Sequence, residues 1–174
     1  EIIDLGFPLV VKPANEGSTM GLSIINSENE ISDAFKLASK YSNNIMFEEF
    51  IPGRELTIGI LGDRFLPVVE IVPNHDLYDY ECKYTKGMSE YFCPAKLDEI
   101  LQQKMQEDAL KLHIVLGCRH YSRVDFRLTE ENEYSMLEIN TLPGMTSTSL
   151  LPKAAKADEI SFNKLLNEII ELAI

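Results

Sequence analysis

The sequence predicts an α+β fold in which mixed or antiparallel sheets pack against amphipathic helices. Residues 121–128 and 134–140 each alternate apolar and polar residues, as half-buried strands do, and residues 129–133 form a polar, hairpin-length connection between them. Gly62-Asp63 joins a second pair of strand-like runs and is a strong hairpin signal. The helices, in which apolar residues recur at helical spacing, are predicted over residues 29–40, residues 97–116 and a last segment that begins at Ser161.

The N-terminal part of the chain predicts a small sheet. Residues 7–11 and 22–25 are typical of strands, and the small polar loop 14–21 lies between them. This unit would cover phosphates if a nucleotide lay beneath it, and is otherwise an ordinary hairpin. A further strand is predicted over residues 44–51, and the turn Pro52-Gly53 that follows it marks the expected boundary between two lobes.

The C-terminal part begins with the strand pair 55–61 and 65–72. Residues 73–94 have weak periodicity, and a structureless stretch of this length is usually functional or disordered, so we expect a loop that is mobile without ligand. The long helix is expected to end at Gly117 and to carry an apolar face made of Leu97, Leu101, Met105, Ala109, Leu112 and Leu116. The last helix, capped by Ser161, is expected to bury Phe162, Leu165, Leu166, Ile169 and Ile170.

Composition narrows the possible partners. The 174 residues carry a net charge of −12 and no basic stripe, which argues against binding to nucleic acid. No apolar run is long enough for a membrane span and no secretory leader is recognisable, so we expect neither. The three cysteines lack metal-ligand spacing and are expected to be reduced thiols of a cytosolic protein. Because the chain starts at Glu1, close to a buried-looking strand, we expect it to be the C-terminal portion of a longer protein.

Three oxygen-bearing residues on the predicted hairpin 121–140 suggest a metal site. Glu138 and Asn140 are two residues apart on one strand, so their side chains leave the same face. If the hairpin sets Asp125 beside them, three hard oxygen ligands of the kind that Mg2+ prefers converge. A solvated acidic face is the alternative, and Arg123 on the same side as Asp125 favours the site.

Four motifs resemble D-alanine–D-alanine ligases, a family of the ATP-grasp superfamily in which two α+β lobes clasp ATP. The motifs are Lys12-Pro-Ala-Asn-Glu-Gly-Ser18, Tyr78-Asp-Tyr-Glu-Cys-Lys-Tyr84, Glu138-Ile-Asn-Thr-Leu-Pro-Gly-Met-Thr146 and Ser147-Thr-Ser-Leu150. The resemblance runs from Gly6 to the C-terminus but covers only the latter part of such a ligase. It implies a partial small lobe over residues 1–52 and a large lobe over residues 53–174 that carries the metal and substrate sites.

The resemblance implies several contacts to ATP. Lys12 is similar to the lysine that contacts the α- and β-phosphates, although a solvated lysine at a strand end is the alternative. Glu48, Phe50 and Ile51 match the hinge that receives adenine, and Glu55 matches the acid that binds ribose. Strand-end glutamates are common, so these roles depend on the resemblance.

The segment around Tyr84 resembles the mobile Ω-loop of the family. Lys83 would reach the γ-phosphate, while Tyr84 and Ser18 would hydrogen-bond across the closed site and exclude water from an acyl phosphate. Ordinary aromatic packing is the alternative for the tyrosines of this loop, Tyr78 and Tyr80 above all. Leu77 stands where the family often has an aromatic residue against adenine, a departure that weakens the expected nucleotide contact.

The resemblance also implies the groups that act on the amino acids. Arg123 and the backbone N–H of Gly144 would stabilise the tetrahedral intermediate. Ser149 and the backbone of Leu150 would receive the carboxylate of the second D-alanine, although Ser-Thr-Ser is also a common helix N-cap sequence. The metal ligands Asp125, Glu138 and Asn140 would hold two Mg2+ ions, with Mn2+ as a possible substitute.

The expected activity is the ATP-dependent joining of two D-alanines in the bacterial cytoplasm for peptidoglycan synthesis, by an enzyme that is a homodimer when whole. The N-terminal segment that supplies a glutamate for the first D-alanine and a first ATP-binding lysine is missing. One alternative is a relative that joins D-alanine to D-lactate or D-serine, against which Tyr84 argues. The others are a different ATP-grasp carboxylate–amine ligase and a non-catalytic fragment that binds nucleotide weakly or not at all.

Overall fold

The computed structural model describes residues 3–73 and 89–174. The chain divides into two compact units: the N-terminal unit holds the described residues up to Ile51 together with Pro73, Ser89 and Glu90, and the C-terminal unit comprises Pro52–Val72 and Tyr91–Ile174. None of the helices in the described ranges has the length and apolarity that crossing a bilayer requires.

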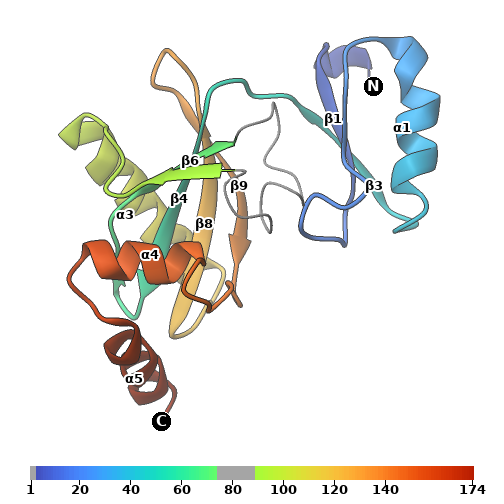
Figure 1. Ribbon diagram of the computed structural model, residues 1–174. Coiled ribbons are helices and arrows are strands. Elements are labelled where there is room, and N and C mark those ends of the chain that lie inside the picture. Colours follow the sequence, from blue (N-terminus) through green and yellow to red (C-terminus); the bar gives the residue numbers. More distant parts are fainter. Residues whose placement is uncertain (1–2, 74–88) are drawn as a thin grey trace. The chain divides into compact units, whose positions relative to one another are not determined.

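The N-terminal unit is a three-stranded antiparallel sheet with one α-helix (Figure 1). The strands β1 (Leu9–Pro13), β2 (Ser23–Ile25) and β3 (Ile45–Glu49) lie in the order β2-β1-β3, after the short 3-10 helix η1 (Ile3–Leu5). The predicted helix 29–40 is confirmed as η2 (Glu28–Glu30) followed by α1 (Ile31–Ala38). A small core forms between α1 and the sheet, from Leu9, Val11, Ile25, Ala34 and Ala38.

The C-terminal unit is built on a second sheet with strand order β7-β6-β4-β8-β9, in which β5 pairs with β4. The strands are β4 (Arg54–Leu61), β5 (Arg64–Phe65), β6 (Val69–Pro73), β7 (Ser89–Phe92), β8 (Tyr121–Leu128) and β9 (Tyr134–Asn140). Both predicted hairpins are present. The single strand predicted over 65–72 is wrong, because Pro67 has no N–H to donate to a ladder and the chain breaks into β5 and β6. The loop predicted over residues 73–94 is wrong where β7 forms, at Ser89–Phe92. The rest of that prediction falls on residues 74–88, which lie outside the described part.

The long helix α3 (Glu99–Val115) covers one face of this sheet. Asp98 caps it by accepting hydrogen bonds from the N–H groups of Ile100 and Leu101 at 3.0 and 3.3 Å. The core beneath it comprises Leu56, Ile58, Ile60, Val68, Ala95, Met105, Ala109, Val124, Phe126 and Leu128. Gly117, at a φ of +66°, ends the helix as predicted. Leu116, the last residue of the predicted apolar face, is the C-cap of α3 and its side chain is 57% exposed, because the chain leaves the helical path there.

Inside this core, the buried ring of His113 predicts a pH-dependent stability. His113 Nδ1 lies 2.7 Å from Ser122 Oγ, and burial lowers the pKa of the imidazole from its usual 6.5. The unfolded chain therefore binds more protons than the native protein between the lowered pKa and 6.5, so the free energy of unfolding falls as the pH drops through this window. Urea unfolding at about pH 7.5 and pH 5.5 should show a larger loss for the wild type than for His113→Gln. Equal losses in the two proteins would contradict this origin.

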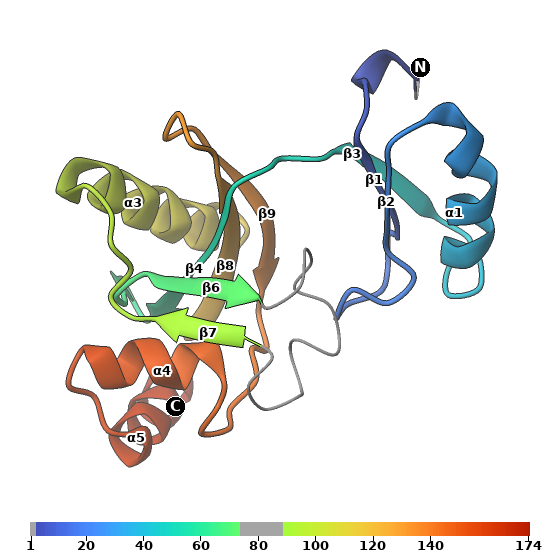
Figure 2. The same cartoon turned by 45° about the horizontal axis from the view of Figure 1, so that its top comes forward.

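The other face of the sheet carries α4 (Leu150–Ala157) and α5 (Phe162–Ala173), and Figure 2 shows α3 and α4 on opposite sides of the strands. The helix α4 was not predicted. The cap at Ser161 is confirmed, since its side chain accepts from the N–H of Lys164 at 3.3 Å. Of the residues expected to be inward on α5, Leu165 is buried but Phe162 and Ile170 are exposed, because α5 packs along a narrow stripe at the end of the unit.

A glycine within β4 allows α4 to approach the sheet closely. A Cβ on Gly59 would lie 2.5 Å from Leu151 Cδ1 of α4 and 3.1 Å from Leu66 Cδ1, and both leucines are fully buried. We expect Gly59→Ala to lower the free energy of unfolding by about 1–3 kcal/mol through overpacking. Urea unfolding measures this, with Gly17→Ala as the control, because a Cβ there meets nothing within 4 Å. Equal stability of the two variants would show that α4 can shift freely.

Candidate active site

The side chains singled out on the predicted hairpin lie on one face of three adjacent strands in the C-terminal unit. Strand register places Asp125 between Thr57 of β4 and Glu138 of β9, and it places Arg123 opposite Asn140. Residues directly opposite one another in antiparallel strands share a face, as do residues two apart on one strand. We name this group the polar ladder; its members are Glu55, Thr57, Arg123, Asp125, Arg127, Glu138 and Asn140. The adjacency is the one that the alternation of residues 121–140 predicts.

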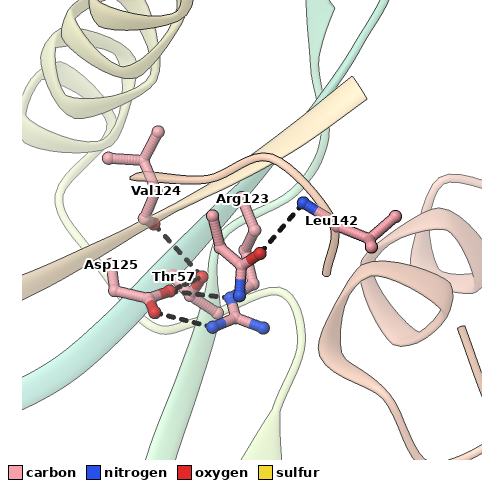
Figure 3. A network of polar contacts seen from close by, with 6 residues as sticks. Thr57, Arg123, Val124, Asp125 and Leu142 are labelled. Carbon is pink, nitrogen blue, oxygen red and sulfur yellow. Dashed lines mark hydrogen bonds and ion pairs between the residues drawn. The ribbon is translucent and has the colours of Figure 1, made fainter. Parts of the chain in front are cut away.

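The Asp125 carboxylate accepts three hydrogen bonds within the polar ladder. Arg123 donates two of these hydrogen bonds to Asp125, from Nε to Oδ1 at 2.8 Å and from Nη2 to Oδ2 at 2.7 Å. Thr57 Oγ1 donates a third to Oδ1 at 2.6 Å (Figure 3). The Asp125 and Arg123 side chains are only 15% and 16% exposed, so the pair is shielded from most of the solvent. Two-pronged contact with a guanidinium and a third donor fixes the carboxylate plane.

Sequence reasoning missed two residues of the polar ladder, Arg127 and the more deeply buried Thr57. Thr57 is 1% exposed, and its hydroxyl lies 3.1 Å from the carbonyl oxygen of Val124 as well as 2.6 Å from Asp125. The available signal was a polar residue inside the otherwise apolar run 56–61. A buried hydroxyl needs a partner, and such a residue in a strand therefore indicates a polar neighbour on the next strand.

A β-bulge shapes the ladder on β9. The pairs Asp125↔Glu138 and Phe126↔Met136 leave Leu137 as an extra residue, so the register shifts between these positions. Bulges of this kind bend a strand and re-aim its side chains, often next to active sites. Beyond the bulge, Asn140 Oδ1 accepts a hydrogen bond from the N–H of Leu142 at 3.0 Å, which orients the amide (Figure 3). The β9 side chains are thereby presented at the end of the hairpin.

The donor set suits a hard divalent cation. Asp125 and Glu138 supply carboxylates from facing positions, and Asn140 supplies an amide oxygen; these are the donor types that Mg2+ and Mn2+ take. No group of three or more His, Cys, Asp and Glu side chains that could hold a metal ion lies among residues 3–73 and 89–174. A cation held here would therefore take an amide and two carboxylates from the chain, with water and substrate oxygens at its remaining positions.

The loop before α4 carries a cluster of hydroxyl groups. Ser149 Oγ accepts from the N–H of Thr146 at 3.0 Å and lies 2.9 Å from Thr146 Oγ1. Ser149 occupies the N-cap position of α4 without a side-chain capping hydrogen bond, so its hydroxyl is not used as a cap, and Leu150 is the first buried residue of the helix. A Cβ on Gly144 would lie 2.9 Å from Ser149 Oγ, so a side chain at position 144 would displace this hydroxyl. Leu151 packs toward Gly59, which puts this end of α4 on the face of the polar ladder.

The nucleotide-directed candidates divide between the two units. In the N-terminal unit, Lys12 Nζ and Glu48 Oε2 form an ion pair at 2.6 Å across β1 and β3. Ser18 lies in the loop after β1 with a left-handed φ of 53°. Phe50 and Ile51 follow β3, and the N–H of Phe50 donates to the carbonyl of Pro8 at 3.1 Å.

In the C-terminal unit, Glu55 of the polar ladder faces Arg127, with Oε2 and Nη1 3.7 Å apart. Arg127 lies two residues beyond Asp125 on β8, so this ion pair is at the opposite end of the ladder from Asn140. Lys83 and Tyr84, with Leu77, lie outside the described residues.

Comparison with known proteins agrees with the motifs. A family model described as "D-ala D-ala ligase C-terminus" matches residues 1–171. The D-alanine–D-alanine ligase of Pelobacter propionicus is 47% identical over 169 residues, which are 97% of this chain and 54% of that protein. The ligase of Aquifex aeolicus is 49% identical over 164 residues, covering 94% of this chain and 56% of the relative. The chain therefore spans about half the length of the curated relatives it matches.

Solved structures give the same result. A D-alanine–D-alanine ligase from Bacillus anthracis superposes with a TM-score of 0.86 at 34% identity, over 98% of this chain and 56% of the other. The same ligase complexed with ATP gives 0.80 at 31% identity, over 99% and 52%. VanG, a D-Ala:D-Ser ligase of Enterococcus faecalis, gives 0.87 at 33% identity, over 99% and 52%. The α+β fold is thus the one predicted, and the chain belongs to the D-alanine–D-alanine ligase family, of which it represents the C-terminal part.

Proposed function

We propose that this chain is the catalytic C-terminal part of an ATP-dependent ligase that joins two D-alanines through an acyl phosphate. The observation that carries the proposal is the polar ladder, in which Arg123, Asp125, Glu138 and Asn140 stand together on β8 and β9. Residues 1–52 would belong to the small ATP-grasp lobe and residues 53–174 to the large one. By the same family argument, the whole enzyme would be a cytoplasmic homodimer that supplies bacterial peptidoglycan synthesis.

The first step transfers a phosphoryl group. A carboxylate oxygen of the first D-alanine attacks the γ-phosphorus of ATP, the bond to the bridging oxygen breaks, and ADP leaves. Asp125, Glu138 and Asn140 would hold Mg2+, which when bound neutralises phosphate charge. Lys12 and Lys83 would add positive charge on the phosphates, and phosphoryl transfer relies mainly on such positioning and electrostatics.

The remaining contacts orient the nucleotide and close the site. Glu48 with the backbone of Phe50 and Ile51 would receive adenine, and Glu55 would accept hydrogen bonds from ribose. In the described state Lys12 is paired to Glu48 at 2.6 Å, so nucleotide binding has to redistribute this contact. Ser18 and Tyr84 would hydrogen-bond across the closed site, which excludes water from the acyl phosphate.

The second step forms the peptide bond. The amine of the second D-alanine attacks the acyl carbon, a proton leaves the nitrogen, and the tetrahedral intermediate collapses with departure of phosphate. Arg123 and the N–H of Gly144 would stabilise the oxyanion, while Ser149 and the backbone of Leu150 would bind the carboxylate of the incoming D-alanine. The hydroxyl cluster around Ser149, on the ladder face of the sheet, supports this assignment.

A second candidate is a ligase that uses D-serine or D-lactate as the second substrate, which the similarity to the VanG D-Ala:D-Ser ligase favours. Tyr84 argues for D-alanine, because depsipeptide-forming relatives usually have another residue there. If Tyr84 sets the preference, Tyr84→Phe raises the share of D-alanyl-D-lactate in the product. An unchanged ratio of the two products would count against this role.

Product analysis tests the proposal. The chain is incubated with Mg-ATP and D-alanine, or with L-alanine, D-serine or D-lactate, and products are identified by mass spectrometry. The proposal expects D-alanyl-D-alanine and stoichiometric phosphate, from the chain alone or after an upstream ligase segment is added. If neither the chain alone nor the chain with the upstream segment makes dipeptide, and calorimetry detects no binding of Mg-ADP, the chain is the non-catalytic fragment of the alternative hypothesis.

A further inference from the structure

The buried hydroxyl of Thr57 lies in the polar ladder but has no role in the reaction proposed above. We propose that Thr57 is a positioning residue, which holds the Asp125 carboxylate in the orientation that a divalent cation requires. This inference rests on the proposed function, because it takes Asp125 as a metal ligand. Thr57 itself would touch neither the cation nor the substrates.

Distance and charge decide where the Thr57 proton goes. A hydroxyl donates one hydrogen, and two acceptors are within reach: Asp125 Oδ1 at 2.6 Å and the carbonyl oxygen of Val124 at 3.1 Å. The shorter distance and the negative charge favour the carboxylate, since hydrogen bonds to ionised acceptors are shorter and about twice as strong as neutral ones. The Thr57 hydroxyl is therefore committed to Asp125.

Burial makes this contact rigid. Thr57 is 1% exposed and lies in β4, between β6 and β8 in the order of the sheet. Its branched Cβ restricts rotation of the side chain, so the hydroxyl has a fixed position. Rotation of an aspartate carboxylate about its last bond is otherwise loosely defined. Thr57 thus supplies a fixed reference point for the oxygen atoms of Asp125.

The hydrogen bonds to Asp125 determine which of its oxygen atoms is available to a cation. Oδ1 accepts from Thr57 Oγ1 and Arg123 Nε, whereas Oδ2 accepts from Arg123 Nη2. A carboxylate has about four acceptor positions, two on each oxygen. Within the described part of the chain, Oδ1 is filled and Oδ2 keeps one position. Without the Thr57 hydroxyl, the remaining acceptor position of Asp125 Oδ2 would no longer be held in the direction of the cation. Groups that hydrogen-bond to metal ligands typically contribute about 10–100-fold to metal affinity.

The test uses Mn2+ alone as the probe and reads each site separately, because a chain with a net charge of −12 also attracts cations nonspecifically. Backbone amide signals of the isotope-labelled chain are followed by NMR as Mn2+ is added, and paramagnetic broadening at Asp125, Glu138 and Asn140 gives an apparent dissociation constant. Thr57→Val keeps the shape of the side chain without the hydroxyl, and Thr57→Ser restores the hydroxyl. Urea unfolding of each variant shows whether it is folded.

Ser122→Ala is the matched control. Ser122 is a fully buried hydroxyl on the neighbouring strand β8, but it contacts His113 at 2.7 Å on the opposite face of the sheet. We expect Thr57→Val to raise the dissociation constant for Mn2+ at the ladder about tenfold. Thr57→Ser, which has the hydroxyl but not the branched Cβ, should recover part of the affinity, and Ser122→Ala should lower stability without changing the dissociation constant.

Three results would overturn the inference, and they differ in what they say of the proposed function. If the wild type binds Mn2+ at the ladder and folded Thr57→Val binds it equally well, Thr57 does not position Asp125 and the proposed function stands. If Thr57→Val unfolds, the comparison of wild type with Thr57→Ser and Ser122→Ala decides: an affinity that follows stability alone refutes positioning. If the wild type shows no selective broadening at the ladder, the metal assignment fails and the inference fails with it.

Discussion

Replacing Asp125 by asparagine should lower D-alanine-dependent phosphate release by about 100-fold or more, since loss of even an outer partner of a metal ligand typically costs about 10–100-fold. The substitution removes the negative charge that attracts a cation. It also places an amide against Arg123 Nε and Nη2, which now donate to Asp125 at 2.8 and 2.7 Å. The assay uses the chain in whichever form releases phosphate, alone or joined to the upstream segment.

The control for Asp125 is Asp108→Asn. Asp108 accepts a hydrogen bond from the hydroxyl of Tyr134 at 2.5 Å and lies on α3, on the other face of the sheet. An asparagine oxygen can still accept from Tyr134 but carries no charge, so the weaker contact should lower stability by up to about 1 kcal/mol and leave phosphate release by the folded protein unchanged. Similar activity of the Asp125 variant and the Asp108 variant would mean that Asp125 is not a metal ligand of the reaction.

Arg123→Met should raise the activation barrier by about 3–4 kcal/mol, roughly 100- to 1,000-fold in kcat, if Arg123 stabilises the tetrahedral oxyanion. Such a contact is made in the transition state, so kcat and kcat/KM should fall together. Arg123→Lys should recover only part of the rate, because an ammonium group cannot reproduce the two-pronged contact to Asp125. Steady-state kinetics with varied D-alanine measures both variants.

Arg54→Met is the matched control for Arg123. Arg54 also makes a two-pronged contact, from Nε and Nη2 to Glu70 at 2.7 Å each, and this hydrogen bonding raises the pKa of the guanidinium. Arg54 lies at the start of β4 and, by the two-residue period of a strand, shares a face with the core residues Leu56 and Ile58, opposite the polar ladder. A loss of kcat in Arg54→Met as large as in Arg123→Met would show that both act only through folding.

The alternation of residues 121–140 was sufficient to predict which side chains meet. The two-residue period of a strand puts Arg123 with Asp125 and Glu138 with Asn140 on one face, and a short hairpin connection makes the two strands neighbours. Capping at Ser161 and the helix end at Gly117 were likewise predictable, because they depend on residues within one turn of the helix.

The features that sequence reasoning missed depend on contacts between distant parts of the chain. Thr57 meets Asp125 across 68 positions, so its role follows only from the register of β4 and β8. The bulge at Leu137 is a local slip that alternation does not reveal. The helix α4 is short, follows a run of Ser and Thr, and has Pro152 in its first turn, where proline is tolerated but gives no helical periodicity.

The most direct test of the account follows an oxygen atom through the reaction. D-alanine carrying a heavy oxygen isotope in its carboxylate is supplied with Mg-ATP, and the released phosphate is analysed by mass spectrometry. If the carboxylate attacks ATP and phosphate leaves from the tetrahedral intermediate, each phosphate carries one labelled oxygen from D-alanine. Phosphate without label, released at the same rate, would mean that water attacks ATP and that the chain does not form an acyl phosphate.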